Sequence, residues 1–172
     1  MKTCAFTGHR PQNLPFGFSE SDILCTKLKD KLQGLVIDKI ENDGIINFMT
    51  GMALGTDLFA AEIVIKLHKL YPYLTLGAVI PCENQCDRWS AEQQNRYYDI
   101  LKQCTYKKVL QKEYTPDCMP KRNKFMIDNA DCLIAVWDGK MSGTGQTVQL
   151  AKDKGIPITV LNPRTIQVSY IV

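Results

Sequence analysis

The stretch "FMTGMALGTD" (48–57), followed by "LFAAEIVIKLHKL" (58–70), decides the fold. A short apolar run ends at Gly51, Gly55 follows four residues later, and apolar residues then recur at helical spacing. This pattern predicts a buried strand that passes into a helix through a glycine-rich turn. Units of this kind, repeated along a chain, build parallel sheets with their loops at the carboxyl ends of the strands.

The same alternation of strand and helix runs through the whole chain. Strands are predicted at 2–8, 44–51, 74–81, 106–111, 131–139 and 156–163, and helices at 19–40, 56–71, 88–104, 119–130 and 143–155. Apolar strands of this kind are typical of parallel sheets that helices cover on both faces. We therefore expect an α/β fold in which residues 1–172 form a single Rossmann-like three-layer domain around a mainly parallel sheet.

The ends of several helices are also marked in the sequence. Ser19 and Ser21 are the expected caps of the helix at 19–40, and Pro72 is expected to end the helix at 56–71. Thr56 and Thr144 are expected to cap the helices that begin beside them.

Composition narrows the class of protein. The chain has 172 residues, 45% hydrophobic and 23% charged, enough for one compact core. No stretch approaches the roughly 18 apolar residues of a membrane span, and the amino terminus shows no export signal. Seven scattered cysteines then indicate reduced thiols in a cytoplasmic protein. Cys82 and Cys86 lack a second Cys/His pair, so no metal is expected, and no cofactor is expected either.

Charge gives little reason to expect a nucleic-acid partner. The net charge is +3, and the basic clusters at 106–112 and 120–124 are of a kind that usually forms solvated surface. The sequence leaves homo-oligomerisation open.

Polar and glycine-rich loops follow the predicted strands, and they supply the candidate site. They are "TGHRP" (7–11), "TGMALGTD" (50–57), "PCE" (81–83) and "WDGKMSGTGQT" (137–147). Two of them are Gly-Thr loops that open a helix, where free N–H groups and the helix dipole favour an anion. Because glycine lets a phosphate approach the backbone, these loops predict a phosphate-bearing ligand.

Several side chains in these loops have two interpretations each. Arg10 would clamp a phosphate or form a surface ion pair, and His9 would donate to the ligand or hold the structure together. Asp57 would accept ribose hydroxyls or stabilise a helix start, and Arg122 and Asn123 would contact the ligand or form a solvated face.

The motifs together resemble a known family. "FTGHRP" (6–11), "TGMALGTDLFAAE" (50–62), "RNKFMIDNAD" (122–131) and "SGTGQTVQLAKDKGIPI" (142–158) resemble, in order and over nearly the whole chain, the YpsA-type branch of the SLOG superfamily. That superfamily includes the DNA-processing protein Smf/DprA and the LOG nucleotide hydrolases. The resemblance implies a Rossmann-like fold that binds a nucleotide or nucleotide-derived ligand, with a role in bacterial cell division or stress.

The loops and the resemblance together give the candidate ligand-binding residues. They are Thr7, Gly8, His9, Arg10, Gly51, Met52, Gly55, Thr56, Asp57, Pro81, Arg122, Asn123, Asp138, Gly143, Thr144 and Thr147. Met52 departs from the family, in which a second glycine is usual, and its side chain is expected to narrow the phosphate cradle.

The sequence is compatible with three functions: a sensor that binds a nucleotide-like molecule, a nucleotide N-glycosidic hydrolase, and a DprA-like protein that binds single-stranded DNA. LOG enzymes resemble one another in a "PGGxGTxxE" loop, whose glutamate lies three residues after the threonine. Here those positions hold Phe59 and Thr147, so a LOG-type hydrolase is not expected. Asp57, Glu83 and Asp138 leave open an acid in a different arrangement.

Overall fold

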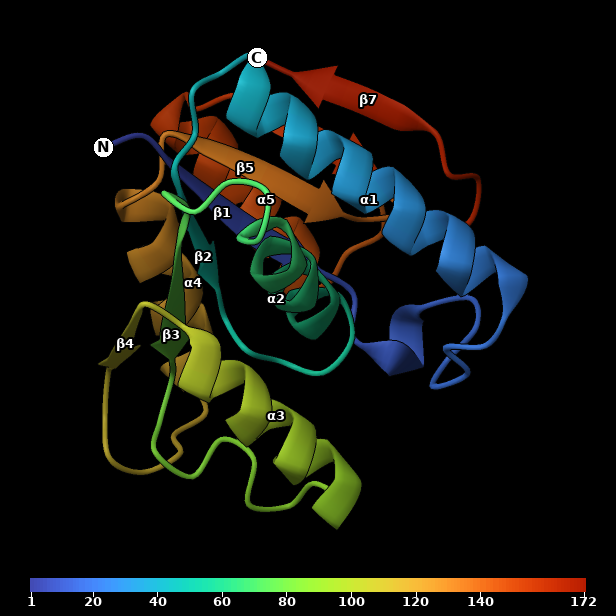
Figure 1. Cartoon of the computed structure of the whole chain (residues 1–172). Coiled ribbons are helices and arrows are strands. Elements are labelled where there is room, and N and C mark those ends of the chain that lie inside the picture. Colours follow the sequence, from blue (N-terminus) through green and yellow to red (C-terminus); the bar gives the residue numbers. More distant parts are fainter.

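One seven-stranded sheet organises the molecule in the computed structural model, which describes residues 1–172. Its strand order is β4-β3-β2-β1-β5-β6-β7 (Figure 1). The strands are β1 (Thr3–Gly8), β2 (Asn47–Thr50), β3 (Thr75–Ile80), β4 (Tyr106–Val109), β5 (Cys132–Val136), β6 (Ile158–Leu161) and β7 (Val168–Ile171). All neighbouring pairs are parallel except β6 and β7.

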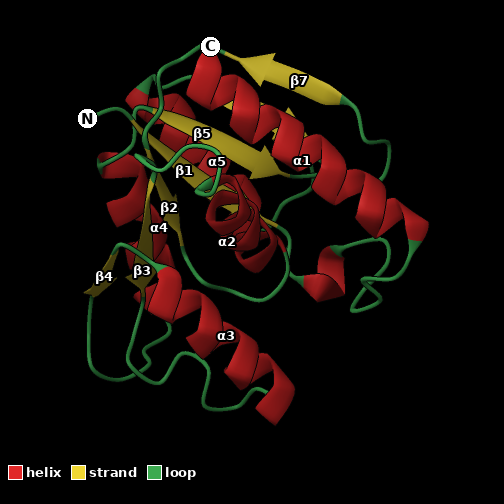
Figure 2. Cartoon of the chain, in the orientation of Figure 1, coloured by secondary structure: helices red, strands yellow, loops and turns green.

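Helices cover both faces of the sheet (Figure 2). They are α1 (Ile23–Glu41), α2 (Thr56–Leu67), α3 (Ala91–Gln103), α4 (Cys118–Asp128) and α5 (Gly143–Lys154), with a short 3₁₀ helix, η1, at Pro11–Asn13. Buried residues of α1, α2 and α3 join one hydrophobic cluster, and those of α4 and α5 join another. The expected three-layer α/β fold with a mainly parallel sheet is confirmed.

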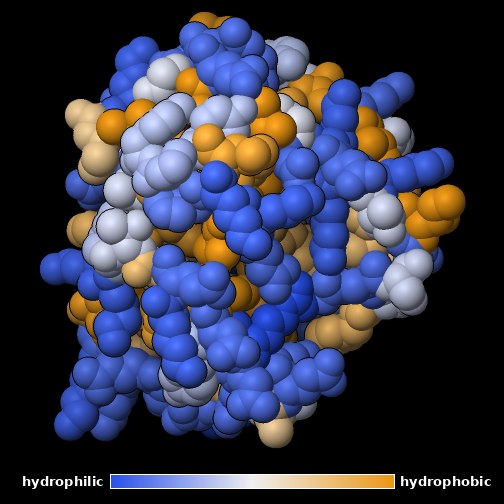
Figure 3. All heavy atoms as spheres, in the orientation of Figure 1, coloured by the Kyte–Doolittle hydropathy of each residue, from blue (hydrophilic) through white to orange (hydrophobic).

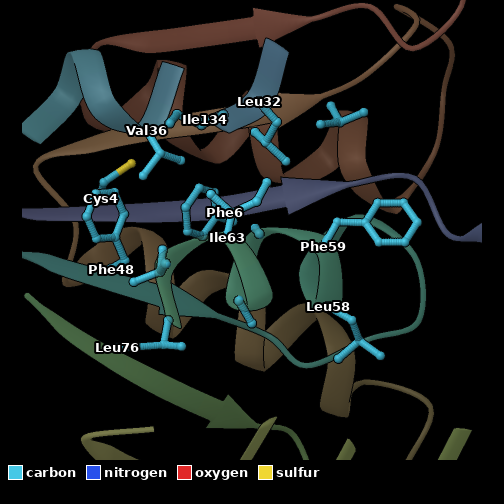
Figure 4. Close-up of a cluster of buried hydrophobic side chains, with 14 of the residues drawn as sticks. Cys4, Phe6, Leu32, Val36, Phe48, Leu58, Phe59, Ile63, Leu76 and Ile134 are labelled. Atoms are coloured by element: carbon cyan, nitrogen blue, oxygen red, sulfur yellow. The ribbon is translucent and has the colours of Figure 1, made fainter. Parts of the chain in front are cut away.

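Strand β1 contributes to both hydrophobic clusters because its side chains point alternately to the two faces of the sheet. Cys4 and Phe6 pack into the larger cluster, whereas Ala5 packs into the smaller one. The ring of Phe6 stacks on that of Phe48 with centroids 5.5 Å apart, in the cluster that Figure 4 shows. This packing buries β1 on both faces and leaves the loop that follows it at the carboxyl end of the sheet.

The chain reverses its direction of winding between β1 and β5. It adds β2, β3 and β4 on one side of β1 and then crosses back to place β5 on the other side. The register pairs Gly8 with Val136, so the loops after these two strands start beside each other. Such a switch point is where open α/β sheets bind ligands.

Two predicted helix boundaries need correction. Helix α1 begins at Ile23, and its cap is Asp22, whose carboxylate accepts the N–H of Leu24 at 2.7 Å. Neither Ser19 nor Ser21 caps it, since the chain enters the helix two residues later. Helix α2 ends at Leu67, well before Pro72, and the following turn carries the chain into β3.

Strand β7 was not predicted. It has four residues, and Ser169 and Tyr170 are exposed, so it lacks the apolar run that marks the buried strands. It forms as a strand because it pairs antiparallel with β6, and its own residue pattern does not indicate this pairing.

The outer surface is mostly hydrophilic on the face that Figure 3 shows, with small apolar areas between polar side chains. None of the helices combines the length and apolar character that crossing a membrane requires.

Candidate functional site

A cleft of about 160 Å³ opens at the carboxyl ends of β1 and β5, between the loop after β1 and the starts of α4 and α5. We call it the switch-point cleft. Nine of the sixteen candidate residues line it: Thr7, Gly8, His9, Arg10, Asp57, Arg122, Asn123, Gly143 and Thr144. The other seven lie outside its lining: Gly51, Met52, Gly55, Thr56, Pro81, Asp138 and Thr147.

The loop at 142–147 presents the start of α5 to the cleft. Ser142 is its cap, and the Ser142 hydroxyl accepts the N–H of Gly145 at 3.1 Å. Thr144 is therefore not the cap that was expected, and its hydroxyl has no hydrogen-bond partner within the chain. The N–H groups of Gly143 and Thr144 lie in the first helical turn, where no intrahelical acceptor exists. This loop thus offers three unused donors at the cleft.

Thr147 has a different role from its neighbours. Its hydroxyl donates to the carbonyl oxygen of Gly143 at 3.0 Å, and the side chain is buried within the helix packing. It stabilises the first turn of α5 without reaching the cleft.

The loop at 50–57 uses its polar groups on the chain itself. The Thr56 hydroxyl donates to the carbonyl oxygen of His9 at 3.0 Å, and the Thr56 N–H reaches the same oxygen at 3.4 Å. Gly55, not Thr56, occupies the cap position of α2, and no side chain caps that helix. The loop therefore holds the segment after β1 in place.

The two glycines of this loop are explained by packing. A Cβ atom at Gly51 would overlap the guanidinium group of Arg122 and press on the Asp57 carboxylate. Gly55 has φ of +87°, and a Cβ there would lie 2.9 Å from the His9 carbonyl oxygen. Gly55 thus needs glycine for its backbone conformation, and a side chain at Gly51 would displace the buried ends of Arg122 and Asp57, so contacts inside the protein explain both glycines.

Met52 does not narrow the cleft, so that expectation is wrong. Its side chain is fully buried in the larger hydrophobic cluster. Its backbone has φ of +58°, a left-handed conformation that glycine adopts without steric cost. A glycine at this position in similar sequences is explained by that conformation.

Arg122 and Asp57 form a buried, oppositely charged pair beside the cleft. Arg122 is only 4% exposed, donates to the Gly51 carbonyl oxygen, and places Nη1 4.0 Å from Oδ2 of Asp57. Burial raises the pKa of Asp57, against the opposing effects of Arg122 and the Ala53 N–H. Burial also lowers the pKa of Arg122. The solvated-face interpretation of Arg122 is wrong.

His9 and Asp138 link the two loops at the switch point. Nε2 of His9 lies 2.9 Å from Oδ1 of Asp138, and both side chains are almost completely buried. Burial opposes ionisation of Asp138, but hydrogen bonds from His9 and from the Lys140 N–H outweigh it and hold the pKa of Asp138 below its usual range. Asp138 therefore contacts His9, which lines the cleft, but does not line the cleft itself.

This contact fixes the tautomer of His9. An ionised carboxylate only accepts hydrogen bonds, so Nε2 carries a proton and donates to Asp138. The Asp138 N–H also lies 3.3 Å from Nε2, but the shorter, charged carboxylate contact dominates. Nδ1 of His9 is then the one buried side-chain polar atom without a partner.

Arg10 is exposed at the cleft and is paired with no carboxylate. Asp57 is the only acidic residue in the lining, and it is already close to Arg122. The guanidinium group of Arg10 is therefore available to an anion.

Eight further residues line the cleft and were not predicted: Phe6, Asn13, Ala53, Met119, Pro120, Met126, Ser142 and Gln146. Ser142 had a usable signal, because a serine ahead of "GTGQT" is a preferred cap. Asn13 and Met119 had none, since the folding of η1 and α4 against the switch point brings them there.

Comparisons with known proteins agree with this architecture. The YpsA model, which describes the YspA SLOG family, matches residues 4–165. The uncharacterised SPbeta prophage-derived protein YoqJ of Bacillus subtilis strain 168 is 36% identical over 138 residues, which cover 73% of this chain and 81% of YoqJ. A UPF0398 protein of Bacillus thuringiensis strain Al Hakam is 31% identical over 163 residues, which cover 90% of this chain and 85% of that protein.

Solved structures of DNA processing protein A (DprA) share the fold. The X-ray structure from Streptococcus pneumoniae has a TM-score of 0.61 at 18% identity and covers 94% of this chain, which spans only 50% of that protein. The structure from Helicobacter pylori, described for its single-stranded DNA binding mode, also has a TM-score of 0.61 at 18% identity, covering 95% of this chain and 66% of its own. The family match and the relatives at 30% identity or more show that the chain belongs to the YspA SLOG family, the YpsA branch of the SLOG superfamily.

Proposed function

We propose that the switch-point cleft binds a phosphate-bearing nucleotide or nucleotide-derived metabolite, and that the protein acts as a sensor or regulator in bacterial cell division or stress. One observation carries the binding proposal: the free donors of Gly143 and Thr144 at the start of α5 line the same cleft as the unpaired Arg10. A helix start and an arginine together favour a phosphate through dipole, hydrogen bonds and charge. The regulatory role rests on the family resemblance.

Asp57 is compatible with a phosphate nearby. Its pKa is raised by burial, and the guanidinium group of Arg122 offsets the charge that remains. The carboxyl group is therefore suited to a sugar hydroxyl next to the phosphate rather than to the phosphate itself.

Native mass spectrometry of freshly purified protein tests for a bound small molecule, and calorimetric titration with AMP measures affinity. Thr144→Val is expected to weaken AMP binding by about 1–2 kcal/mol, the scale of a lost hydrogen bond. Thr147→Val is the matched control, because that hydroxyl bonds within α5 and does not line the cleft. Equal losses in the two variants, or no binding of phosphate-bearing nucleotides by the wild type, would contradict the proposal.

Hydrolysis of an N-glycosidic bond is a second candidate, and the environment of Asp57 favours it. A buried carboxyl group with a raised pKa beside a cleft is suited to act as a general acid. The LOG arrangement is absent, because Phe59 and Thr147 occupy the positions three residues after the two threonines. Glu62, further along α2, lies outside the cleft and pairs with Arg96 at 2.7 Å. Incubation with a panel of nucleoside monophosphates, with chromatography of released base, decides this. Turnover that Asp57→Asn abolishes would establish the hydrolase, and binding without turnover would support the sensor.

A further inference from the structure

A second groove, of about 290 Å³, adjoins the switch-point cleft. Arg10, Ala53 and Met119 line both spaces, so a ligand that contacts them in the cleft reaches the groove directly. Its remaining lining comes from the segment after β1, from Leu54 ahead of α2, and from the loop before α3 with the first turn of that helix. We call it the arginine–aromatic groove, after Arg10, Arg88, Phe18 and Trp89.

The charge of this groove is entirely positive. Arg10 and Arg88 line it, no aspartate or glutamate does, and neither arginine forms an ion pair. A neighbouring groove on the other side of Phe18 differs, because its Arg96 pairs with Glu20 and Glu62. The arginine–aromatic groove alone therefore offers unneutralised cations beside the cleft.

Aromatic rings make up the apolar part of the groove. Phe18 is 58% exposed and pairs with no other aromatic ring, so a large apolar surface faces the groove and solvent. Trp89 is half-buried and held by Tyr97, with ring centroids 5.5 Å apart and planes at 90°. An exposed ring, a fixed indole and two guanidinium groups are the surfaces on which planar heteroaromatic rings stack.

We propose that the arginine–aromatic groove binds the planar base of the ligand whose phosphate lies in the switch-point cleft. The inference rests on the proposed function, and it specifies the ligand as a nucleotide with an intact base rather than a sugar phosphate. The occupant is a small nucleotide. A net charge of +3 and two arginines in the groove supply few phosphate contacts for a nucleic-acid strand.

Two ligands that differ only in the base test the proposal: AMP and ribose 5-phosphate. Calorimetry is expected to show that Phe18→Ala weakens AMP binding roughly tenfold, the effect of removing one stacking ring, and leaves ribose 5-phosphate unchanged. Tyr73→Ala is the control, since Tyr73 is 57% exposed and lies ahead of the amino end of β3, whereas the groove lies beyond the carboxyl ends of the strands. Equal weakening of both ligands by Phe18→Ala, or none, would overturn the inference.

Trp89 supplies a readout of the groove itself. In a Trp137→Phe background it is the only tryptophan. Because the Trp137 indole donates to the Lys140 carbonyl oxygen ahead of α5, calorimetry must first show that this background binds AMP as the wild type does. AMP and adenosine are then both expected to quench the Trp89 fluorescence, while ribose 5-phosphate does not. Wild-type protein that binds AMP and ribose 5-phosphate equally, without quenching, would refute the base subsite and leave the phosphate site standing. Adenosine binding without any preference for AMP would refute the phosphate site instead. An eight-nucleotide oligothymidylate that binds more tightly than AMP, with strong salt dependence, would overturn the small-molecule occupant.

Discussion

The two Gly-Thr loops, residues 50–57 and 142–147, both lie between a strand and a helix, but their hydrogen-bond donors have different partners. In the first, Thr56 donates to the carbonyl oxygen of His9. In the second, Ser142 caps the helix and the donors of Gly143 and Thr144 stay free at the cleft. The difference indicates that such a loop offers an anion site only when no other part of the chain accepts the free donors of its helix's first turn.

Replacing one glycine of each loop by alanine should give the largest difference in stability between the two loops. Gly51→Ala places a Cβ within the Arg122 guanidinium group and forces two buried side chains to move, so we expect the free energy of unfolding to fall by about 1–3 kcal/mol. A Cβ at Gly143 meets no atom within 4 Å, so Gly143→Ala should change the free energy of unfolding by less than about 0.5 kcal/mol. Urea denaturation measures both, and similar losses would show that the loops are built alike.

Removal of the Thr56 hydroxyl should separate stability from binding. Thr56→Val loses the hydrogen bond to His9 and is expected to lower the free energy of unfolding by about 1 kcal/mol. Its affinity for AMP should stay close to that of the wild type, because Thr56 does not line the cleft. A loss of affinity as large as that of Thr144→Val would place the phosphate at the first loop instead.

The pH dependence of stability should distinguish the aspartates that accompany the two loops. The raised pKa of Asp57 means that the folded protein holds this proton more tightly than the unfolded chain. The stability of the wild type relative to Asp57→Asn should therefore fall as the pH rises above about 4 and through the folded-state pKa.

Asp138 should behave in the opposite way. Its lowered pKa stabilises the fold above about pH 4, and this contribution is lost as the pH falls through the folded-state pKa. The stability difference between wild type and Asp138→Asn should shrink on acidification. Denaturant titrations across this range test both signs, and parallel curves for the two variants would contradict the assigned environments.

The sequence predicted the sheet well where strands are apolar runs, as in β1 and β5, because burial on both faces leaves a continuous hydrophobic signal. It missed β7, whose two exposed residues break that signal. It also misplaced the start of α1, because Ser19, Ser21 and Asp22 are all good caps and only tertiary packing selects among them.

The sequence predicted which loops meet at the carboxyl ends of β1 and β5, but not the contacts within them. Parallel topology alone brings the loops after β1 and β5 together, which places His9, Arg10 and Thr144 around one cleft. The reason for Gly51 lies in Arg122, 71 residues later in the chain, and no local pattern reports such a contact.

The central claim is that the second loop, and not the first, holds the phosphate. Amide proton–nitrogen correlation spectra recorded during a titration with AMP test it most directly. We expect the largest shifts at Gly143 and Thr144, with little change at Gly55 and Thr56, whose loop bonds to the chain itself. Shifts centred on Gly55 and Thr56, or none at Gly143 and Thr144 at saturating AMP, would contradict the account.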